Sequence, residues 1–258
     1  MSSRNFYNSP VHRFYVPDLD PTAGRVTLPA DESRHLVGVL RLTEGAEVAV
    51  FDGRGREFSA RVTSVRRTGV GVALVAPRAP AREPAIAIAL APVVLKGDKM
   101  DEVVRDAVMA GAAAIHPLIS ARAEVSLAAV RRAERRARWQ RIAVASAKQC
   151  GRAVVPPVET VRTFEEWVGA DGDAPTGLVV ALVEPSLAVG GTLASLPAAP
   201  RPTSAVLLVG PEGGWTPDEI ARLSAREVRL VSLGSRTLRA DAVPVVAISL
   251  LQFIWGDL

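Results

Sequence analysis

The chain has 258 residues, of which 48% are hydrophobic and 22% charged, which excludes an intrinsically disordered protein and allows a sizeable core. Its formal net charge of +4 favours an anionic partner, with nucleic acid first. Cys150 is the only cysteine and the three histidines lie far apart, so the sequence excludes an internal disulfide and predicts no metal site. No apolar run reaches the roughly 18 residues of a membrane span. Met1–Pro10 also lacks an apolar signal segment, so we expect a cytoplasmic protein without membrane contact.

The first third of the chain is typical of a small β-barrel with one helix. Short runs with alternating apolar residues predict strands at Arg13–Val16, Val26–Leu28, Glu47–Phe51, Glu57–Val65 and Val70–Val75. The turn Asp52-Gly53-Arg54-Gly55 between two of these runs is a good hairpin signal. Between the second and third runs, Glu32–Leu42 places Leu36, Val39 and Leu40 on one face of a predicted helix.

A linker rich in Pro, Ala and Arg at residues 76–84 precedes a second pattern, in which strands alternate with helices. We therefore expect two domains, residues 1–80 and residues 81–258. The predicted strands of the second domain are Ala85–Leu95, Ala113–Ile119, Leu178–Val183, Val206–Val209 and Val228–Leu233. Its predicted helices are Asp98–Ala110, Leu127–Gly151, Thr216–Ser224 and Val243–Trp255, and its predicted surface loops are Gly169–Thr176 and Leu196–Thr203. This order indicates an α/β fold with a parallel sheet and right-handed crossovers.

One buried strand ends in the stretch Gly210-Pro211-Glu212-Gly213-Gly214, and the helix after it has a complete start signal. Thr216 is the predicted N-cap, Pro217 takes the first helical position, and Glu219 completes a capping box. Ligands of open α/β sheets bind at the carboxyl ends of the strands, where glycines let the backbone approach them closely. The stretch lacks the spacing of a dinucleotide or phosphate loop, so it favours a neutral or cationic ligand; a tight turn alone is the other interpretation.

A second buried strand also ends in a glycine loop, at Gly234-Ser235-Arg236, with Arg239 close behind. Asp241 is expected to cap the last helix, and Pro244 falls in the first turn of that helix, where a missing N–H costs little. The other interpretation of Arg236 and Arg239 is that they are solvated charges on a surface loop. Two glycine loops after neighbouring buried strands predict one shared pocket.

The predicted helix Leu127–Gly151 carries mostly positive charge. The helix and the residue directly after it contain one acidic side chain, Glu134. Their basic residues are Arg131, Arg132, Arg135, Arg136, Arg138, Arg141, Lys148 and Arg152. Such a helix fits a phosphate backbone, and the other interpretation is a solvated face with arginine stems lying along the surface.

No histidine close in sequence could activate Cys150, so a packing role is favoured over that of a nucleophile. Arg152 is a candidate contact to a phosphate or a base.

Short motifs occur in a fixed order along nearly the whole chain. They are Arg13-Phe14-Tyr15, Arg34-His35-Leu36, Val39-Leu40-Arg41, Phe51-Asp52-Gly53, Lys96-Gly97-Asp98-Lys99-Met100, Arg138-Trp139-Gln140-Arg141-Ile142, Gln149-Cys150-Gly151-Arg152, Leu208-Val209-Gly210-Pro211-Glu212-Gly213-Gly214 and Leu233-Gly234-Ser235-Arg236-Thr237-Leu238-Arg239. Each motif is weak alone, but the ordered set at this spacing is specific. With it the chain resembles the RsmE family of the SPOUT superfamily, bacterial enzymes that methylate N3 of a uridine in 16S ribosomal RNA.

The resemblance implies an N-terminal PUA-like β-barrel that binds RNA, a C-terminal parallel-sheet α/β domain with a deep trefoil knot, and a homodimer. It implies S-adenosylmethionine as the methyl donor and the small ribosomal subunit as the partner. The implied donor-binding residues are Leu182, Val183, Val209, Gly210, Glu212, Gly213, Leu233, Gly234, Leu238 and Arg239. The RNA contacts expected on the barrel and the basic helix are Arg34, Arg41, Arg131, Arg135 and Arg138.

The same resemblance nominates Arg152, and after it Arg13, as catalytic residues. The N3 of uridine is a poor nucleophile until it loses its proton, and a nearby arginine could stabilise the anionic base that results. Because N3 lies on the Watson–Crick edge, the target uridine has to be unpaired or splayed out.

One stretch departs from the family pattern. After Leu-Arg the family has Thr-Glu-Thr-Ala or a similar sequence, whereas this chain has Ala240-Asp241-Ala242-Val243. The carboxylate is one methylene shorter and a hydroxyl is missing. The alternatives that stay open are a SPOUT methyltransferase with a different RNA target and a non-catalytic RNA-binding ribosome assembly factor. The absence of a GxGxxG motif disfavours a nicotinamide-dependent oxidoreductase.

Overall fold

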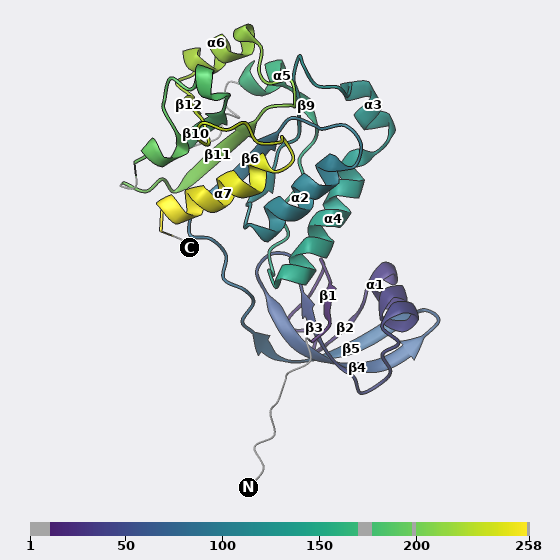
Figure 1. The fold of residues 1–258 in the computed structure, drawn as a ribbon. Helices are drawn as coiled ribbons and strands as arrows, with labels where there is room; N and C mark the ends of the chain where they lie inside the picture. Colours follow the sequence, from purple (N-terminus) through teal and green to yellow (C-terminus); the bar gives the residue numbers. More distant parts are fainter. Residues whose placement is uncertain (1–10, 170–176, 198–199, 257–258) are drawn as a thin grey trace. The chain divides into compact units, whose positions relative to one another are not determined.

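A computed structural model describes residues 11–169, 177–197 and 200–256 of the chain (Figure 1). The chain forms two compact units. Unit 1 contains the chain up to Arg82 together with Ala147–Val155, and unit 2 contains Glu83–Ser146 and the chain from Pro156 onward. The short segment Ala147–Val155, expected in the second domain, thus belongs to unit 1. Met1–Pro10 and parts of both predicted loops, at 170–176 and 198–199, lie outside the described residues.

Unit 1 is built on a five-stranded sheet with the order β1-β3-β4-β5-β2. The strands are β1 (Arg13–Tyr15), β2 (Arg25–Thr27), β3 (Glu47–Phe51), β4 (Glu57–Arg66) and β5 (Gly69–Arg78). β1 pairs parallel with β3, and the other neighbours pair antiparallel. Alternating residues, among them Phe14, Val50 and Val72, fill a buried core because successive strand side chains point to opposite faces.

The helix predicted at Glu32–Leu42 begins and ends earlier than expected and changes type. It consists of α1 (Ala30–Arg34) and the π-helical turn η1 (His35–Val39). Arg41 adopts a positive φ of 52°, a conformation that ends a right-handed helix. Leu36 is fully buried, as its place in the pattern predicts, while Val39 is 66% exposed.

Unit 2 is built on a five-stranded parallel sheet with the order β12-β10-β11-β6-β7. The strands are β6 (Ala87–Pro92), β7 (Ala114–Ile115), β10 (Leu178–Leu182), β11 (Ser204–Val209) and β12 (Arg229–Val231), and β8 (Leu118–Ile119) pairs separately with β9 (Arg162–Thr163). The strand predicted at Ala113–Ile119 is therefore two short strands. They are separated by His116 and Pro117, and proline has no N–H to donate to a ladder.

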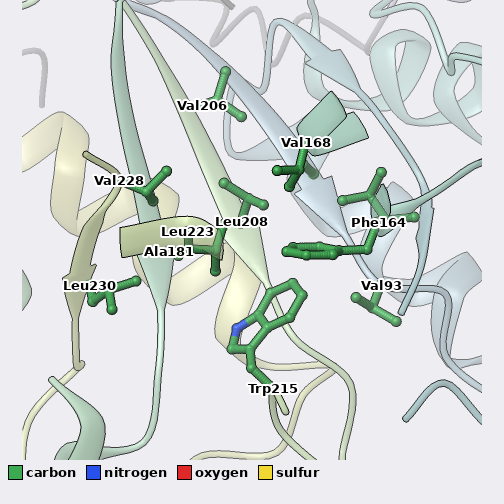
Figure 2. Close-up of a cluster of buried hydrophobic side chains, with 12 residues drawn as sticks. Val93, Phe164, Val168, Ala181, Val206, Leu208, Trp215, Leu223, Val228 and Leu230 are labelled. Atoms are coloured by element: carbon green, nitrogen blue, oxygen red, sulfur yellow. The ribbon is translucent and has the colours of Figure 1, made fainter. Parts of the chain in front are cut away.

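Helices cover both faces of this sheet (Figure 1). On one face α2 (Lys99–Met109) packs against α7 (Val243–Ile254), which also contacts β6 and β11. On the other face α5 (Phe164–Gly169) and α6 (Pro217–Ala225) meet the strands in a buried cluster (Figure 2). The cluster includes Phe164, Val168, Ala181, Val206, Leu208, Trp215, Leu223 and Leu230. No helix within the described ranges is long and apolar enough to cross a membrane.

The single basic helix predicted at Leu127–Gly151 is two helices, α3 (Leu127–Arg132) and α4 (Arg135–Cys150). The break falls at Ala133 and Glu134, and Glu134 adopts a positive φ of 48°. This conformation interrupts the helical hydrogen bonds. No glycine or proline stands there, so the sequence carried no signal for the break.

Candidate active site

Three chain segments meet at the carboxyl edge of the parallel sheet in unit 2. They follow β10, β11 and β12, which are neighbours in the sheet because β10 lies between the other two. The segments surround a cavity of about 310 Å³, to which Lys99 at the start of α2 also contributes. Parallel strands bring their carboxyl ends to one edge, so loops that are far apart in sequence form one cavity.

Nine of the ten residues expected to bind the methyl donor line this cavity. They are Leu182, Val183, Val209, Gly210, Glu212, Leu233, Gly234, Leu238 and Arg239. Gly213 is not among the lining residues, and a Cβ added there would meet the Cβ of Arg122 at 3.4 Å. Arg122 also donates from Nη1 to the Gly213 carbonyl at 2.8 Å. Gly213 therefore lies against Arg122, between the lining residues Glu212 and Gly214, and its expected contact with the donor stays a prediction.

Trp215 lines the cavity, although the sequence did not single it out. Its Nε1 donates to the carbonyl of Leu182 at 3.0 Å, which joins the loop after β11 to the end of β10. Its ring is 4% exposed and lies 5.5 Å from the ring of Phe164, tilted by 49° (Figure 2). A Cβ on Gly210 would lie 3.0 Å from Nε1 of Trp215, so the indole needs a glycine at that position.

The helix start signal after this loop is confirmed. Thr216 accepts from the N–H of Glu219 at 3.2 Å, and Glu219 accepts in return from the N–H of Thr216 at 2.8 Å. The second carboxylate oxygen of Glu219 accepts from the N–H of Ala121 at 2.9 Å. The capping box therefore also fixes the exit of the cavity loop against a distant segment.

Two ion pairs stand at the cavity. Lys99 Nζ lies 2.7 Å from Oε1 of Glu212, and Arg239 donates to both carboxylate oxygens of Asp241 at 3.2 and 2.9 Å. Asp241 was expected to cap α7, and this is wrong, because the N-cap position is Ala242 and has no side-chain hydrogen bond. The carboxylate that departs from the family pattern therefore holds Arg239 at the cavity.

The pKa of Glu212 reflects two opposing causes. Burial and the nearby Asp241 raise it, but the hydrogen bond and the charge of Lys99, with a backbone hydrogen bond, lower it below its ordinary value. The hydrogen bond with Glu212 raises the pKa of Lys99 in turn. Both groups are charged near neutral pH. The stabilisation by Glu212 is present above its unfolded pKa and is lost as pH falls through its lower folded pKa.

We expect Lys99→Gln to raise the pKa of Glu212, because burial then acts without the opposing cation. A carboxyl-carbon NMR titration of the wild type and the variant measures this shift. Lys96→Gln is the matched control, since Lys96 pairs with Glu124 instead, at 3.2 Å. An unchanged Glu212 titration in Lys99→Gln would mean that the pair does not set the charge at the cavity.

Arg13 and Arg152, the two expected catalytic residues, lie in unit 1. All five N–H groups of Arg13 are engaged: Nε and Nη2 donate to Glu57 at 3.2 and 2.7 Å, and Nη1 donates to the carbonyls of Ala147 and Lys148 at 2.8 and 2.9 Å. The remaining N–H of Nη2 donates to the carbonyl of Arg152 at 2.9 Å. Arg13 has no donor left for a substrate, so the geometry favours a positioning role for it.

The arginines expected to contact RNA fall in both units. Arg34 and Arg41 are exposed in unit 1, and Arg131 is exposed on α3 in unit 2. Arg135 is partly exposed, whereas Arg138 forms ion pairs with Asp98 and Asp101. The acidic residues of α2 and its N-cap thus offset part of the positive charge that the sequence assigned to the basic helix. Within the described ranges, no group of three or more histidine, cysteine or acidic side chains could hold a metal ion.

Comparisons with known proteins agree on one family. The sequence profile of the RNA methyltransferase domain matches residues 82–252, and that of the RNA methyltransferase PUA domain matches residues 28–72. Ribosomal RNA small subunit methyltransferase E of Bacillus subtilis is 29% identical over 88% of this chain and 89% of its own length. The enzyme of the same name from Synechocystis is 32% identical over 87% of this chain and 71% of its own length.

Solved structures give the same result. The crystal structure of ribosomal RNA small subunit methyltransferase E from Neisseria gonorrhoeae bound to S-adenosyl methionine has a TM-score of 0.85 and 31% identity, and the match covers 95% of this chain and 98% of that one. A Legionella pneumophila protein in complex with the bound cofactor SAM has the same TM-score and coverage at 28% identity. These matches confirm the predicted parallel-sheet α/β domain and the PUA-like domain. The chain belongs to the RsmE family of RNA methyltransferases.

Proposed function

We propose that the chain transfers a methyl group from S-adenosylmethionine to N3 of a uridine in 16S ribosomal RNA of the small subunit, in the cytoplasm. The cavity at the carboxyl edge of β10, β11 and β12 is the observation that carries this proposal. It gathers nine residues that the family resemblance assigned to the donor from three separate loops. The named activity of the relatives supports the choice of reaction.

The residues at the cavity fit the proposed donor. Apolar surface for the flat adenine ring of the donor comes from Leu182, Val183 and Leu238. Glu212 and Asp241 are each neutralised by an ion pair, with Lys99 and Arg239, so the cavity carries both signs of charge and suits a donor that has cationic groups and a carboxylate. When bound, the donor supplies an already activated methyl group, so the protein mainly has to position the acceptor.

Arg152 is the proposed catalytic residue. It is 4% exposed and belongs to unit 1, and Arg13 holds its backbone carbonyl. Gly151, with a positive φ of 87°, turns the chain at the end of α4 just before it. We propose that the Arg152 guanidinium stabilises the uridine anion, which forms when N3 releases its proton to water, and that Arg13 positions Arg152. Arg34, Arg41, Arg131 and Arg135 are the proposed phosphate contacts.

Transfer of tritiated methyl groups from S-adenosylmethionine to small subunits that lack the modification tests the function directly. The expected product after digestion is 3-methyluridine. A different methylated base or a ribose 2′-O-methyl product would indicate another RNA target. Binding of the subunit without donor affinity or transfer would indicate the non-catalytic assembly factor.

The homodimer is part of the proposal, and an exposed apolar stripe supports it. Val246, Leu250 and Phe253 lie on α7 at spacings of four and three residues and are 37%, 39% and 70% exposed. Met109 on the contacting helix α2 is 39% exposed. A stripe on the outer surface of two packed helices fits a second copy of the same chain.

We expect Phe253→Asp to raise the dimer dissociation constant by at least about 100-fold, because a twofold interface loses the buried ring twice and gains two charges. Sedimentation over a concentration series measures this. Val75→Asp in unit 1, where Val75 is 66% exposed, is the control and should leave the assembly unchanged. A dimer that persists in Phe253→Asp would remove the stripe as its interface.

We also propose the deep trefoil knot for unit 2. β12 is an edge strand of the sheet, yet α7, which follows it, packs against β11 and β6 beyond the neighbouring strand. α7 also contacts the 3-10 turn η3 (Leu193–Ser195) in the connection between β10 and β11. A chain end that crosses the loops of earlier strands is what a knot requires. Tracing the backbone of an experimental structure tests it.

A further inference from the structure

A rigid turn in unit 1 has no role in the function described so far. It connects β3 to β4, and Asp52 organises it from inside. Oδ1 of Asp52 accepts from the backbone N–H groups of Arg54 and Arg56 at 2.7 and 3.1 Å, and Oδ2 accepts from Nε of Arg56 at 2.7 Å. Asp52 is 1% exposed, and these contacts lower its pKa although burial opposes them. The Asp52 carboxylate therefore stabilises the turn, with both of its oxygens hydrogen-bonded within it.

The segment after α4 holds the same turn from outside. The N–H of Gly55 donates to the carbonyl of Ala153 at 3.1 Å, and the N–H of Val155 donates to the carbonyl of Gly53 at 3.0 Å. Gly53 has a positive φ of 76°, and a Cβ there would lie 2.7 Å from Cε2 of Tyr15. Gly53 of the turn therefore packs against the Cε2 edge of the Tyr15 side chain, and hydrogen bonds fix the turn on both sides.

Two side chains at this turn, Arg54 and Tyr15, are at least partly exposed to solvent. Arg13 and Arg56 are each neutralised by a buried carboxylate, whereas the exposed Arg54 side chain has no ion pair with any described residue. Tyr15 is partly exposed, and its ring lies 5.5 Å from that of Phe51, tilted by 41°. Burial raises the pKa of Tyr15 and the charge of Arg54 opposes this, and Gly53, the residue before Arg54, lies against the Tyr15 side chain.

We propose that Tyr15 and Arg54 form a nucleotide subsite of unit 1, in which an unstacked RNA base lies on the Tyr15 ring and a backbone phosphate pairs with Arg54. This inference rests on the proposed RNA substrate. An aromatic face beside an unneutralised arginine is the combination that binds single-stranded RNA, because every base has a π-face and every nucleotide a phosphate. The exposed Asp18, which also raises the pKa of Tyr15, disfavours a phosphate near the hydroxyl and leaves Arg54 as the phosphate contact.

The subsite lies beside the proposed catalytic residue. Ala153, which accepts the hydrogen bond from the turn, directly follows Arg152 in the chain. The nucleotide held by Tyr15 and Arg54 is therefore a neighbour of the target uridine and would help to hold that uridine out of a stack.

The test uses the full chain without the methyl donor and a fluorescent single-stranded RNA dodecamer that contains uridine, with binding followed by anisotropy. We expect Arg54→Gln to raise the dissociation constant about tenfold and to reduce the slope of log affinity against log salt by about 0.7, the value for one phosphate on a single strand. Tyr15→Leu should also weaken binding about tenfold, and Tyr15→Phe, which keeps the ring, less than about twofold.

Arg67→Gln is the matched control, because Arg67 is an exposed arginine on the β4–β5 turn of the same unit. An equal loss in Arg67→Gln and Arg54→Gln would overturn the subsite in favour of diffuse charge attraction. Wild-type affinity in both Arg54→Gln and Tyr15→Leu would also overturn the subsite. The proposed function would still stand if the wild type transfers methyl groups to small subunits. If Tyr15→Leu melts at a much lower temperature, Arg54→Gln and its salt slope decide alone. A wild type that binds no dodecamer would overturn the subsite, and methyl transfer to small subunits would then decide the proposed function separately.

Discussion

Arg152→Ala is expected to lower the rate of methyl transfer by about 100-fold or more, the usual effect of removing one donor from a developing anion. The affinity for S-adenosylmethionine should stay at the wild-type value, because Arg152 lies in unit 1 and the cavity is lined by residues of unit 2. Single-turnover transfer to unmodified small subunits and calorimetry with the donor measure the two quantities.

The pH profile separates this role from a structural one. If Arg152 stabilises the uridine anion, the variant should need a higher pH to form it, so its rate should continue to rise with pH beyond the point where the wild type levels off. Arg152→Lys keeps a positive charge and should recover part of the rate, though without the planar fork of donors. An Arg152→Ala enzyme with the wild-type rate, or with a uniformly reduced rate and an unshifted profile, would exclude the residue from the chemistry.

Gly210→Val is expected to lower the affinity for S-adenosylmethionine by at least about 100-fold, because overpacking at a rigid site costs a few kcal/mol. A Cβ at Gly210 would lie 3.0, 3.1 and 3.4 Å from three atoms of the Trp215 indole, and the ring cannot retreat because Phe164 and the rest of a buried cluster lie behind it. The displaced indole would lose its hydrogen bond to the Leu182 carbonyl and disturb two cavity walls together.

Gly213→Ala, in the same loop, provides the control. Its added methyl group would make an ordinary contact of 3.4 Å with Arg122, outside the cavity, so donor affinity should stay near the wild-type value. If Gly210→Val does not fold, Trp215→Phe keeps a ring but removes the N–H donor, and a loss of affinity of about fivefold is expected. Equal donor affinity in the wild type, Gly210→Val and Trp215→Phe would place the donor elsewhere.

Local signals in the sequence predicted the elements around the cavity. The capping box at Thr216 and Glu219 was readable because its two hydrogen bonds join residues three positions apart. The cavity itself was predictable because two buried strands each end in a glycine loop, and parallel strands end at one edge. The side chains that complete it were not readable in the same way, because their partners lie far along the chain: Trp215 donates to Leu182, and Lys99 pairs with Glu212.

By itself, the sequence determined the α/β class, the small β-sheet unit before it and the loops that line the cavity, since periodicity, caps and glycine turns act over a few residues. Only the tertiary structure decided that Gly213 lies against Arg122, that Asp241 holds Arg239, and that Arg13 uses all its donors within unit 1. The same holds for the segment Ala147–Val155, which belongs to unit 1. A side chain's partner depends on which distant segments the fold brings within about 3 Å, a hydrogen-bond distance, and no local pattern records that.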